Sequence, residues 1–154
     1  MSSAPGGEEE VRRLLATYQQ YQAQADGIMH QLSLTQITAE GLERALVAVE
    51  ALDKAQVGQE ILVPIGSGSF IHGSLASKER VVLNVGSGVS IEKTTAEAKD
   101  ILKVRKAEVL EGSKKLNVVL AKIDQEMQKI QAIMQQFEEN ANSHQHGPGS
   151  EGVV

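Results

Sequence analysis

The sequence predicts an α+β fold: a long antiparallel two-helix coiled coil with two β-hairpins between the helices, the hairpins assembling into an inter-subunit β-barrel. Three observations support this prediction. Apolar residues recur with heptad spacing over residues 11–49 and again over residues 99–137. Between these stretches, Ile65-Gly-Ser-Gly68 returns as Val85-Gly-Ser-Gly88. The chain therefore reads as helix, strands and helix.

Residues 1–7 are rich in Gly and Ser and are expected to form a disordered tail, followed by an N-terminal coiled-coil helix over residues 8–57. Glu8, Glu9 and Glu10 suit a helix start because acidic side chains oppose the positive end of the helix dipole. A sustained 3.5-residue repeat indicates a coiled coil rather than an ordinary amphipathic helix. Its seam positions are Val11, Leu14, Tyr18, Tyr21, Ala25, Ile28, Leu32, Thr35, Ala39, Leu42, Leu46 and Val49.

Residues 58–93 have the composition of an assembly module made of two β-hairpins. β-branched runs flank Gly66-Ser-Gly68 and Gly86-Ser-Gly88, and glycine in a short connection favours a tight turn. The runs at 61–65 and 81–85 are apolar on both faces. Because isolated hairpins are marginally stable and have unpaired edges, we expect them to pair with hairpins of other subunits.

The C-terminal coiled-coil helix is predicted over residues 94–139, and residues 140–154 are expected to be a second disordered tail. Thr94 and Glu97 have the spacing of a capping box, in which each side chain bonds the other residue's backbone N–H. The seam is half polar near its start and fully apolar toward its end. It comprises Lys99, Leu102, Lys106, Val109, Ser113, Leu116, Leu120, Ile123, Met127, Ile130, Met134 and Phe137.

Composition argues against several classes of function. A net charge of −5 without a basic stripe disfavours nucleic acid as a partner, and the absence of cysteine excludes thiol chemistry. No apolar run approaches the roughly 20 residues that span a bilayer, and the N-terminus lacks signal-peptide features, so we expect a cytoplasmic protein without membrane contact. The Gly-Ser-Gly turns lead into strands rather than helices, unlike phosphate-binding loops. We find no catalytic residues, no metal site and no cofactor site.

The hairpin segment carries a family resemblance. Residues Leu62 to Phe70, read as LVPIGSGSF, and Val85-Gly-Ser-Gly88 leading to Ile91-Glu-Lys-Thr94 are similar to the hairpin signature of alpha-class prefoldin subunits, most closely the archaeal type. The resemblance covers about residues 8–139. It implies that the chain is a subunit of an ATP-independent chaperone. This chaperone would be a hexamer of two alpha and four beta subunits whose hairpins form the barrel. It further implies that the coiled-coil tips hold non-native polypeptides and deliver them to a group II chaperonin.

The tips of the coiled coil are the candidate client-binding site. An apolar patch at a free helix end indicates a binding surface, and methionine adapts to varied partners. Closure of the coiled-coil seam is the alternative interpretation for the seam members, whereas Leu15 and Ile133 lie outside the seam and favour binding. We call the whole set the tip residues: Val11, Leu14, Leu15, Tyr18, Met127, Ile130, Ile133, Met134 and Phe137.

The strands supply the candidate assembly residues, namely Ile61, Val63, Ile65, Phe70, Val81, Leu83 and Val85. A second function remains open for this architecture. The chain could be a structural coiled-coil adaptor with a β dimerisation module and no client binding. That alternative predicts a stable assembly that leaves refolding proteins unaffected.

Overall fold

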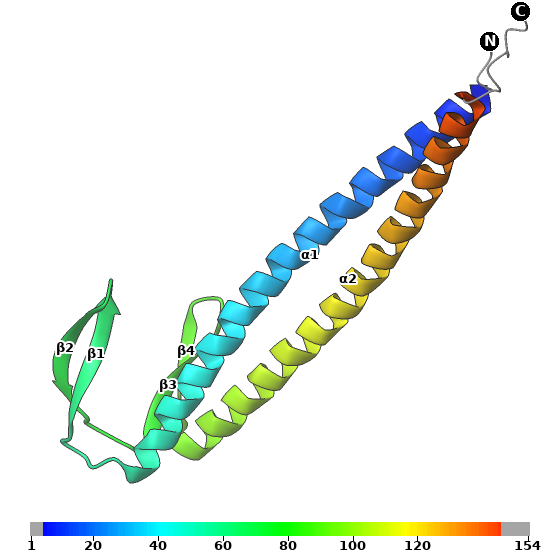
Figure 1. Ribbon diagram of the computed structural model, residues 1–154. Coiled ribbons are helices and arrows are strands. Elements are labelled where there is room, and N and C mark those ends of the chain that lie inside the picture. Colours follow the sequence, from blue (N-terminus) through cyan, green and yellow to red (C-terminus); the bar gives the residue numbers. More distant parts are fainter. Residues whose placement is uncertain (1–4, 146–154) are drawn as a thin grey trace, which may run out of the picture. The chain divides into compact units, whose positions relative to one another are not determined.

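The computed structural model describes residues 5–145 and confirms the predicted order of helix, two hairpins and helix (Figure 1). A short 3₁₀ turn, η1, follows the first helix. The elements are α1 (Pro5–Ala51), η1 (Leu52–Lys54), β1 (Glu60–Gly66), β2 (Ser69–Ser74), β3 (Arg80–Gly86), β4 (Val89–Thr94) and α2 (Thr95–Gln145).

Each helix extends beyond its predicted bound at one end, whereas α1 ends at Ala51 rather than at the predicted residue 57. α1 begins three residues before the expected start at Glu8, and α2 continues past residue 139 to Gln145. Residues 140–145, which the sequence placed in a disordered tail, are therefore helical. Their hydrogen bonds include the Ser143 hydroxyl donating to the Asn140 carbonyl over 3.0 Å. The rest of the two expected tails, residues 1–4 and 146–154, lies outside the described residues.

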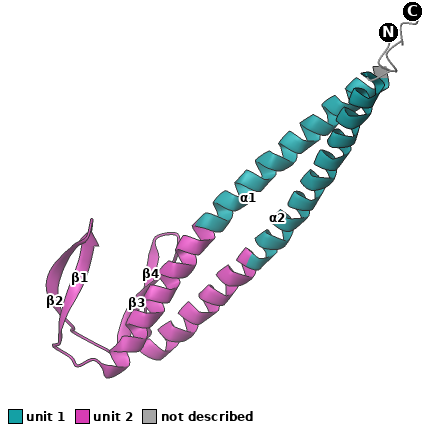
Figure 2. Ribbon diagram, in the orientation of Figure 1, with its two compact units in different colours: residues 1–33, 114–154 teal, residues 34–113 magenta. Residues whose placement is uncertain are grey.

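The chain divides into two compact units (Figure 2). Unit 1 combines residues 1–33 with residues 114–154, and unit 2 contains residues 34–113. Each helix contributes one segment to each unit.

In unit 1, the two helical segments pack along the predicted seam. Ile123 and Ile130 of α2 are buried, with exposed fractions of 6% and 7%. The remaining seam positions in both segments are half-buried. The Gln131 amide donates to the Tyr18 hydroxyl over 2.9 Å and so joins α1 to α2. The heptad pattern is thereby confirmed as the contact surface of the two segments.

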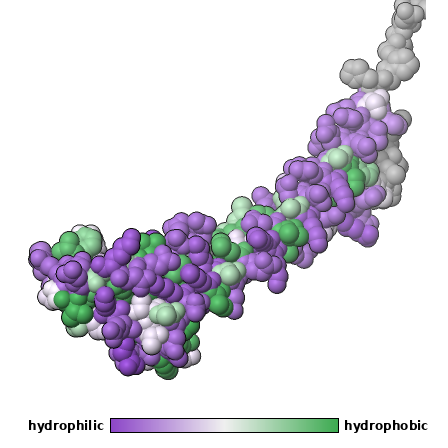
Figure 3. All heavy atoms as spheres, turned by 90° about the horizontal axis from the view of Figure 1, so that it is seen from below, coloured by the Kyte–Doolittle hydropathy of each residue, from purple (hydrophilic) through white to green (hydrophobic). Residues whose placement is uncertain are grey.

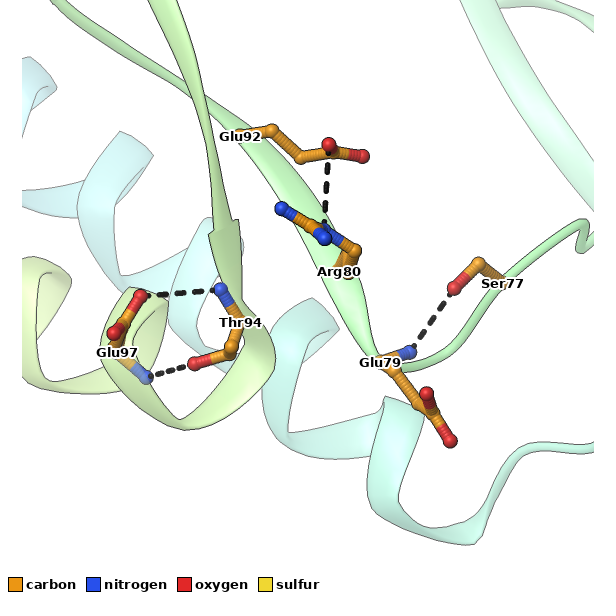
Figure 4. Close-up of polar contacts among 6 residues, drawn as sticks. All are labelled: Ser77, Glu79, Arg80, Glu92, Thr94 and Glu97. Atoms are coloured by element: carbon orange, nitrogen blue, oxygen red, sulfur yellow. Dashed lines mark hydrogen bonds and ion pairs between the residues drawn. The ribbon is translucent and has the colours of Figure 1, made fainter.

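In unit 2, α2 begins with the predicted capping box (Figure 4). The Glu97 backbone N–H donates to the Thr94 hydroxyl over 3.2 Å, and the Thr94 N–H donates to the Glu97 carboxylate over 3.3 Å. The Thr95 hydroxyl, in a buried residue, donates to the Lys78 carbonyl over 2.7 Å. These bonds satisfy backbone groups that a helix start leaves unpaired and tie the helix to the segment before β3.

The core of unit 2 joins both helices to the second hairpin. Its buried members are Leu46, Val49, Leu83, Ala98 and Leu102, and Leu42, Ala45, Val81 and Ile101 pack against them. Leu46 and Leu102 come from the paired helices, whereas Leu83 comes from β3. The second hairpin is therefore fixed to the helices of its own chain.

The hairpins form separate two-stranded antiparallel sheets, β1 with β2 and β3 with β4. Their turns have the same geometry. Ser67 and Gly68 have φ angles of 51° and 73°, and Ser87 and Gly88 have 52° and 74°. Positive φ at both central residues matches the twist of the flanking strands, and glycine adopts it without steric cost. The repeated Gly-Ser-Gly motif thus encodes the same turn twice.

Candidate functional site

The tip residues lie on the two helical segments of unit 1, and the structure separates them by exposure. Leu15 and Ile133 have exposed fractions of 46% and 41%. Ile130 is buried at 7%. The others are half-buried: Val11, Leu14, Tyr18, Met127, Met134 and Phe137.

This division follows the seam geometry. Leu14 and Ile130 occupy seam positions and face the partner helix, whereas Leu15 is displaced from the seam by one residue. For Ile130, burial supports the seam interpretation and removes it from the available surface. The two off-seam side chains, Leu15 and Ile133, remain as apolar groups open to a partner.

Unit 1 also contains a groove that the sequence did not indicate. It has a volume of about 520 Å³ and lies between residues 22–29 of α1 and residues 117–127 of α2. Ala25 on α1 and Ala121 on α2 both line it. These small side chains leave space between the two helices that larger seam residues would fill. The sequence contains one indication of this groove. Ala25 is a small residue at a seam position, whereas the two preceding seam positions are Tyr18 and Tyr21.

The candidate assembly residues behave differently in the two hairpins. Leu83 is buried at 9% within the chain's own core, and Val81 packs against that core. Both residues therefore contact the helices of the same chain, and their role in contacts between subunits stays a prediction. Val63, Ile65 and Phe70 of the first hairpin are 39%, 62% and 57% exposed.

Ile61 is half-buried, and Val85 in the second hairpin is 44% exposed. Among the residues of β1 and β2, none is buried. Further exposed apolar side chains that the sequence analysis did not select are Leu62, Ile71, Val82 and Val89. Figure 3 shows apolar surface in separate green patches among hydrophilic surface. The first hairpin therefore presents apolar side chains that its own chain leaves uncovered.

A diagonal pair of polar side chains crosses the strands of each hairpin at equivalent positions of the repeat. Glu60 and His72 approach to 2.6 Å in the first hairpin, and Arg80 and Glu92 to 3.3 Å in the second (Figure 4). All four side chains are more than half exposed. Such exposed pairs contribute about 1 kcal/mol or less, so apolar contacts dominate the binding capacity of the hairpins.

Other site types receive no support from the described residues. Within residues 5–145, no group of three or more His, Cys, Asp or Glu side chains could hold a metal ion. The helices of this part of the chain also lack a segment long and apolar enough to cross a membrane.

The chain is similar in sequence to known proteins. The family model for prefoldin subunits matches residues 21–139. The prefoldin subunit alpha of Methanothrix thermoacetophila is 52% identical over 118 residues, which cover 76% of this chain and 77% of the relative. That of Pyrococcus horikoshii is 31% identical over 132 residues, which cover 85% and 89%.

A solved cryo-EM structure of filamentous PFD from Methanocaldococcus jannaschii has a similar fold. It aligns with a TM-score of 0.65 and 23% identity, over 75% of this chain and 95% of that one. At this identity, the likeness supports the fold. The family match and the sequence relatives together show that the chain belongs to the prefoldin family and is similar to its archaeal alpha subunits.

Proposed function

We propose that the chain is the alpha subunit of a cytoplasmic chaperone that holds non-native polypeptides without ATP and delivers them to a group II chaperonin. The observation that supports client binding most directly is the exposure of Leu15 and Ile133 beside the half-buried seam residues. Exposed aliphatic side chains bind the apolar residues of unfolded chains because the contact removes both apolar surfaces from water. Membership of the prefoldin family supports the chaperone role.

Weak contacts suffice for this activity. Burying one Leu-sized side chain contributes roughly 1.5–3 kcal/mol, which does not offset the entropy lost when two molecules associate. Several subunits that contact one client raise its effective concentration and so hold it reversibly. This mechanism needs no nucleotide.

Assembly would provide the several binding sites. The first hairpin has no buried residue, and a two-stranded hairpin is marginal in water unless other strands or a helix cover it. We propose that Val63, Ile65 and Phe70 pack against hairpins of beta subunits, in a barrel shared by two alpha and four beta subunits. Val85 would contribute the exposed part of the second hairpin.

Client binding is tested by the double variant Leu15→Ser/Ile133→Ser in the assembled complex. The readout is suppression of aggregation of a chemically denatured client, and we expect a loss of at least half of the suppression. Leu110→Ser is the matched control, because Leu110 also lies on α2, outside the tip residues, and is 45% exposed. Full suppression by an intact double variant would exclude Leu15 and Ile133 as the client-binding site. An unaltered complex that suppresses no aggregation would support the adaptor alternative instead.

Assembly has its own test. The chain is mixed with an archaeal prefoldin beta subunit, and the mass of the complex is measured. A mass of two alpha and four beta subunits supports the proposal, and Phe70→Ser should reduce the fraction assembled. A complex that forms equally well with Phe70→Ser and Ile65→Ser would exclude the first hairpin as the interface.

A further inference from the structure

The groove of unit 1 has apolar walls made of seam residues and their neighbours. Ala25 and Met29 line it from α1, and Leu120, Ala121 and Met127 line it from α2. Met29 is 49% exposed, and Leu120 and Met127 are half-buried. The flexible thioether side chains of Met29 and Met127 can adjust to partners of different shape. The volume of about 520 Å³ lies in the range of pockets that accept a small ligand or a few side chains.

Carboxylates stand at the same groove, one on each helix. Asp26 on α1 and Asp124 on α2 both line it and are both exposed. Their levels along the helix pair follow from the Tyr18–Gln131 hydrogen bond. Seven residues along α1 from Tyr18 lead to position 25, and seven residues back along α2 from Gln131 lead to Asp124. Because both helices advance equally per residue, Asp26 and Asp124 lie at nearly the same level.

These carboxylates have no cationic partner in the described part of the chain. Asp124 accepts one hydrogen bond from the neutral Gln128 amide over 3.1 Å, which leaves its charge uncompensated. Asp26 takes part in none of the ion pairs within residues 5–145. Two like charges at one level repel each other, and a cation placed between them would relieve that repulsion.

We propose that this groove binds lysine or arginine side chains of a non-native polypeptide, in segments where apolar residues flank the cation. A lysine or arginine side chain combines the two kinds of group that the groove can bind, an aliphatic stem and a cation. Its aliphatic stem can lie against Met29 and Met127, while its charged end reaches Asp26 or Asp124. The flanking apolar residues of the segment pack on Ala25, Leu120 and Ala121. This inference rests on the proposed client-holding function and specifies which client segments are held.

The test uses the full chain in its assembled complex and two labelled, unstructured peptides. One peptide repeats Leu and Lys with Gly and Ser spacers, and its twin has Glu in place of Lys. Binding is measured by fluorescence anisotropy at low salt.

Asp26→Asn/Asp124→Asn preserves the shape of the groove and removes its charge. We expect it to weaken binding of the Lys peptide roughly 3- to 10-fold, since exposed ion pairs are individually weak. Binding of the Glu peptide should not weaken.

The matched control is Glu108→Gln/Glu111→Gln, which changes the net charge equally at exposed positions of α2 outside the groove. It should change binding of the Lys peptide less than 2-fold. Ala121→Leu fills the groove without a change in charge and should also weaken the Lys peptide. If Ala121→Leu fails to fold, as judged by circular dichroism, the asparagine pair decides. If Asp26→Asn/Asp124→Asn and Glu108→Gln/Glu111→Gln weaken binding of the Lys peptide equally, the proposal is overturned. The peptide would then be attracted by the overall negative charge of the chain and not by the groove.

The outcomes separate this inference from the proposed function. Suppression of aggregation that depends on Leu15 and Ile133, with peptide binding independent of Asp26 and Asp124, would refute the groove alone. Loss of peptide binding in the asparagine pair, with no suppression of aggregation by the unaltered complex, would refute the holding function and leave the groove as a peptide site.

Discussion

Leu83 of β3 and Leu102 of α2 lie in one buried cluster, with exposed fractions of 9% and 3%. This contact makes the two hairpins unequal although their sequences repeat. Val63 occupies the position in the first hairpin that Leu83 occupies in the second, and it is 39% exposed. One hairpin is thus part of the chain's own core, and the other leaves its apolar residues uncovered.

Leu83→Ala should therefore destabilise the isolated chain far more than Val63→Ala. Loss of a buried leucine costs about 2–4 kcal/mol, because the removed atoms leave the core and a cavity remains. Val63→Ala should cost less than about 1 kcal/mol, since that side chain is partly hydrated already. Urea unfolding followed by circular dichroism measures both. Equal costs would show that the first hairpin also packs on the helices.

The capping box predicts a second difference in stability. Thr94→Ala removes the hydroxyl that accepts from the Glu97 N–H and should lower the free energy of unfolding by about 1 kcal/mol. Thr38→Ala is the control, because the Thr38 hydroxyl only donates to the Leu34 carbonyl within a helix. That change should be neutral or slightly stabilising, given the higher helix propensity of alanine. Thermal unfolding distinguishes the two, and a neutral Thr94→Ala would contradict the cap.

The two lysines of the polar seam pair with carboxylates of α1 and of the turn that follows it. Lys106 pairs with Glu43, and Lys99 pairs with Asp53 of η1. Lys106 is 33% exposed and Glu43 is 49% exposed, so solvent screens their attraction. A double-mutant cycle with Lys106→Ala and Glu43→Ala should give a coupling energy of about 0.5 kcal/mol that falls in 1 M salt. A coupling that is insensitive to salt would indicate a contact other than this ion pair.

The turn geometry predicts opposite effects at neighbouring serines. Ser67 has a φ of 51°, which asparagine tolerates and β-branched residues resist. Ser67→Asn should stabilise the first hairpin, whereas Ser67→Val should destabilise it by about 1 kcal/mol or more. Ser69→Val, in β2, is the control and should be neutral or favourable. Hydrogen exchange of hairpin amides reports these local effects, and tolerance of Ser67→Val would argue against this turn.

The sequence predicted those features that local chemistry determines. Heptad spacing identified the seam residues, the Thr94–Glu97 spacing identified the cap, and the Gly-Ser-Gly repeats identified both turns. The different fates of Leu83 and Val63 could not be predicted, because both belong to similar apolar strands. A strand pattern shows that a face will be covered but does not identify the element that covers it. The groove was missed for a related reason, since a heptad counts Ala25 as apolar regardless of its volume.

The central claim is that non-native polypeptides contact the off-seam tip residues Leu15 and Ile133. Site-specific photo-crosslinking in the assembled complex tests it most directly, with the photoreactive amino acid at position 15, 133 or 110 in turn and a denatured client added. The account predicts abundant client adducts from positions 15 and 133 and few from position 110. Adducts that are absent at 15 and 133, or equally abundant at all three positions, would contradict it.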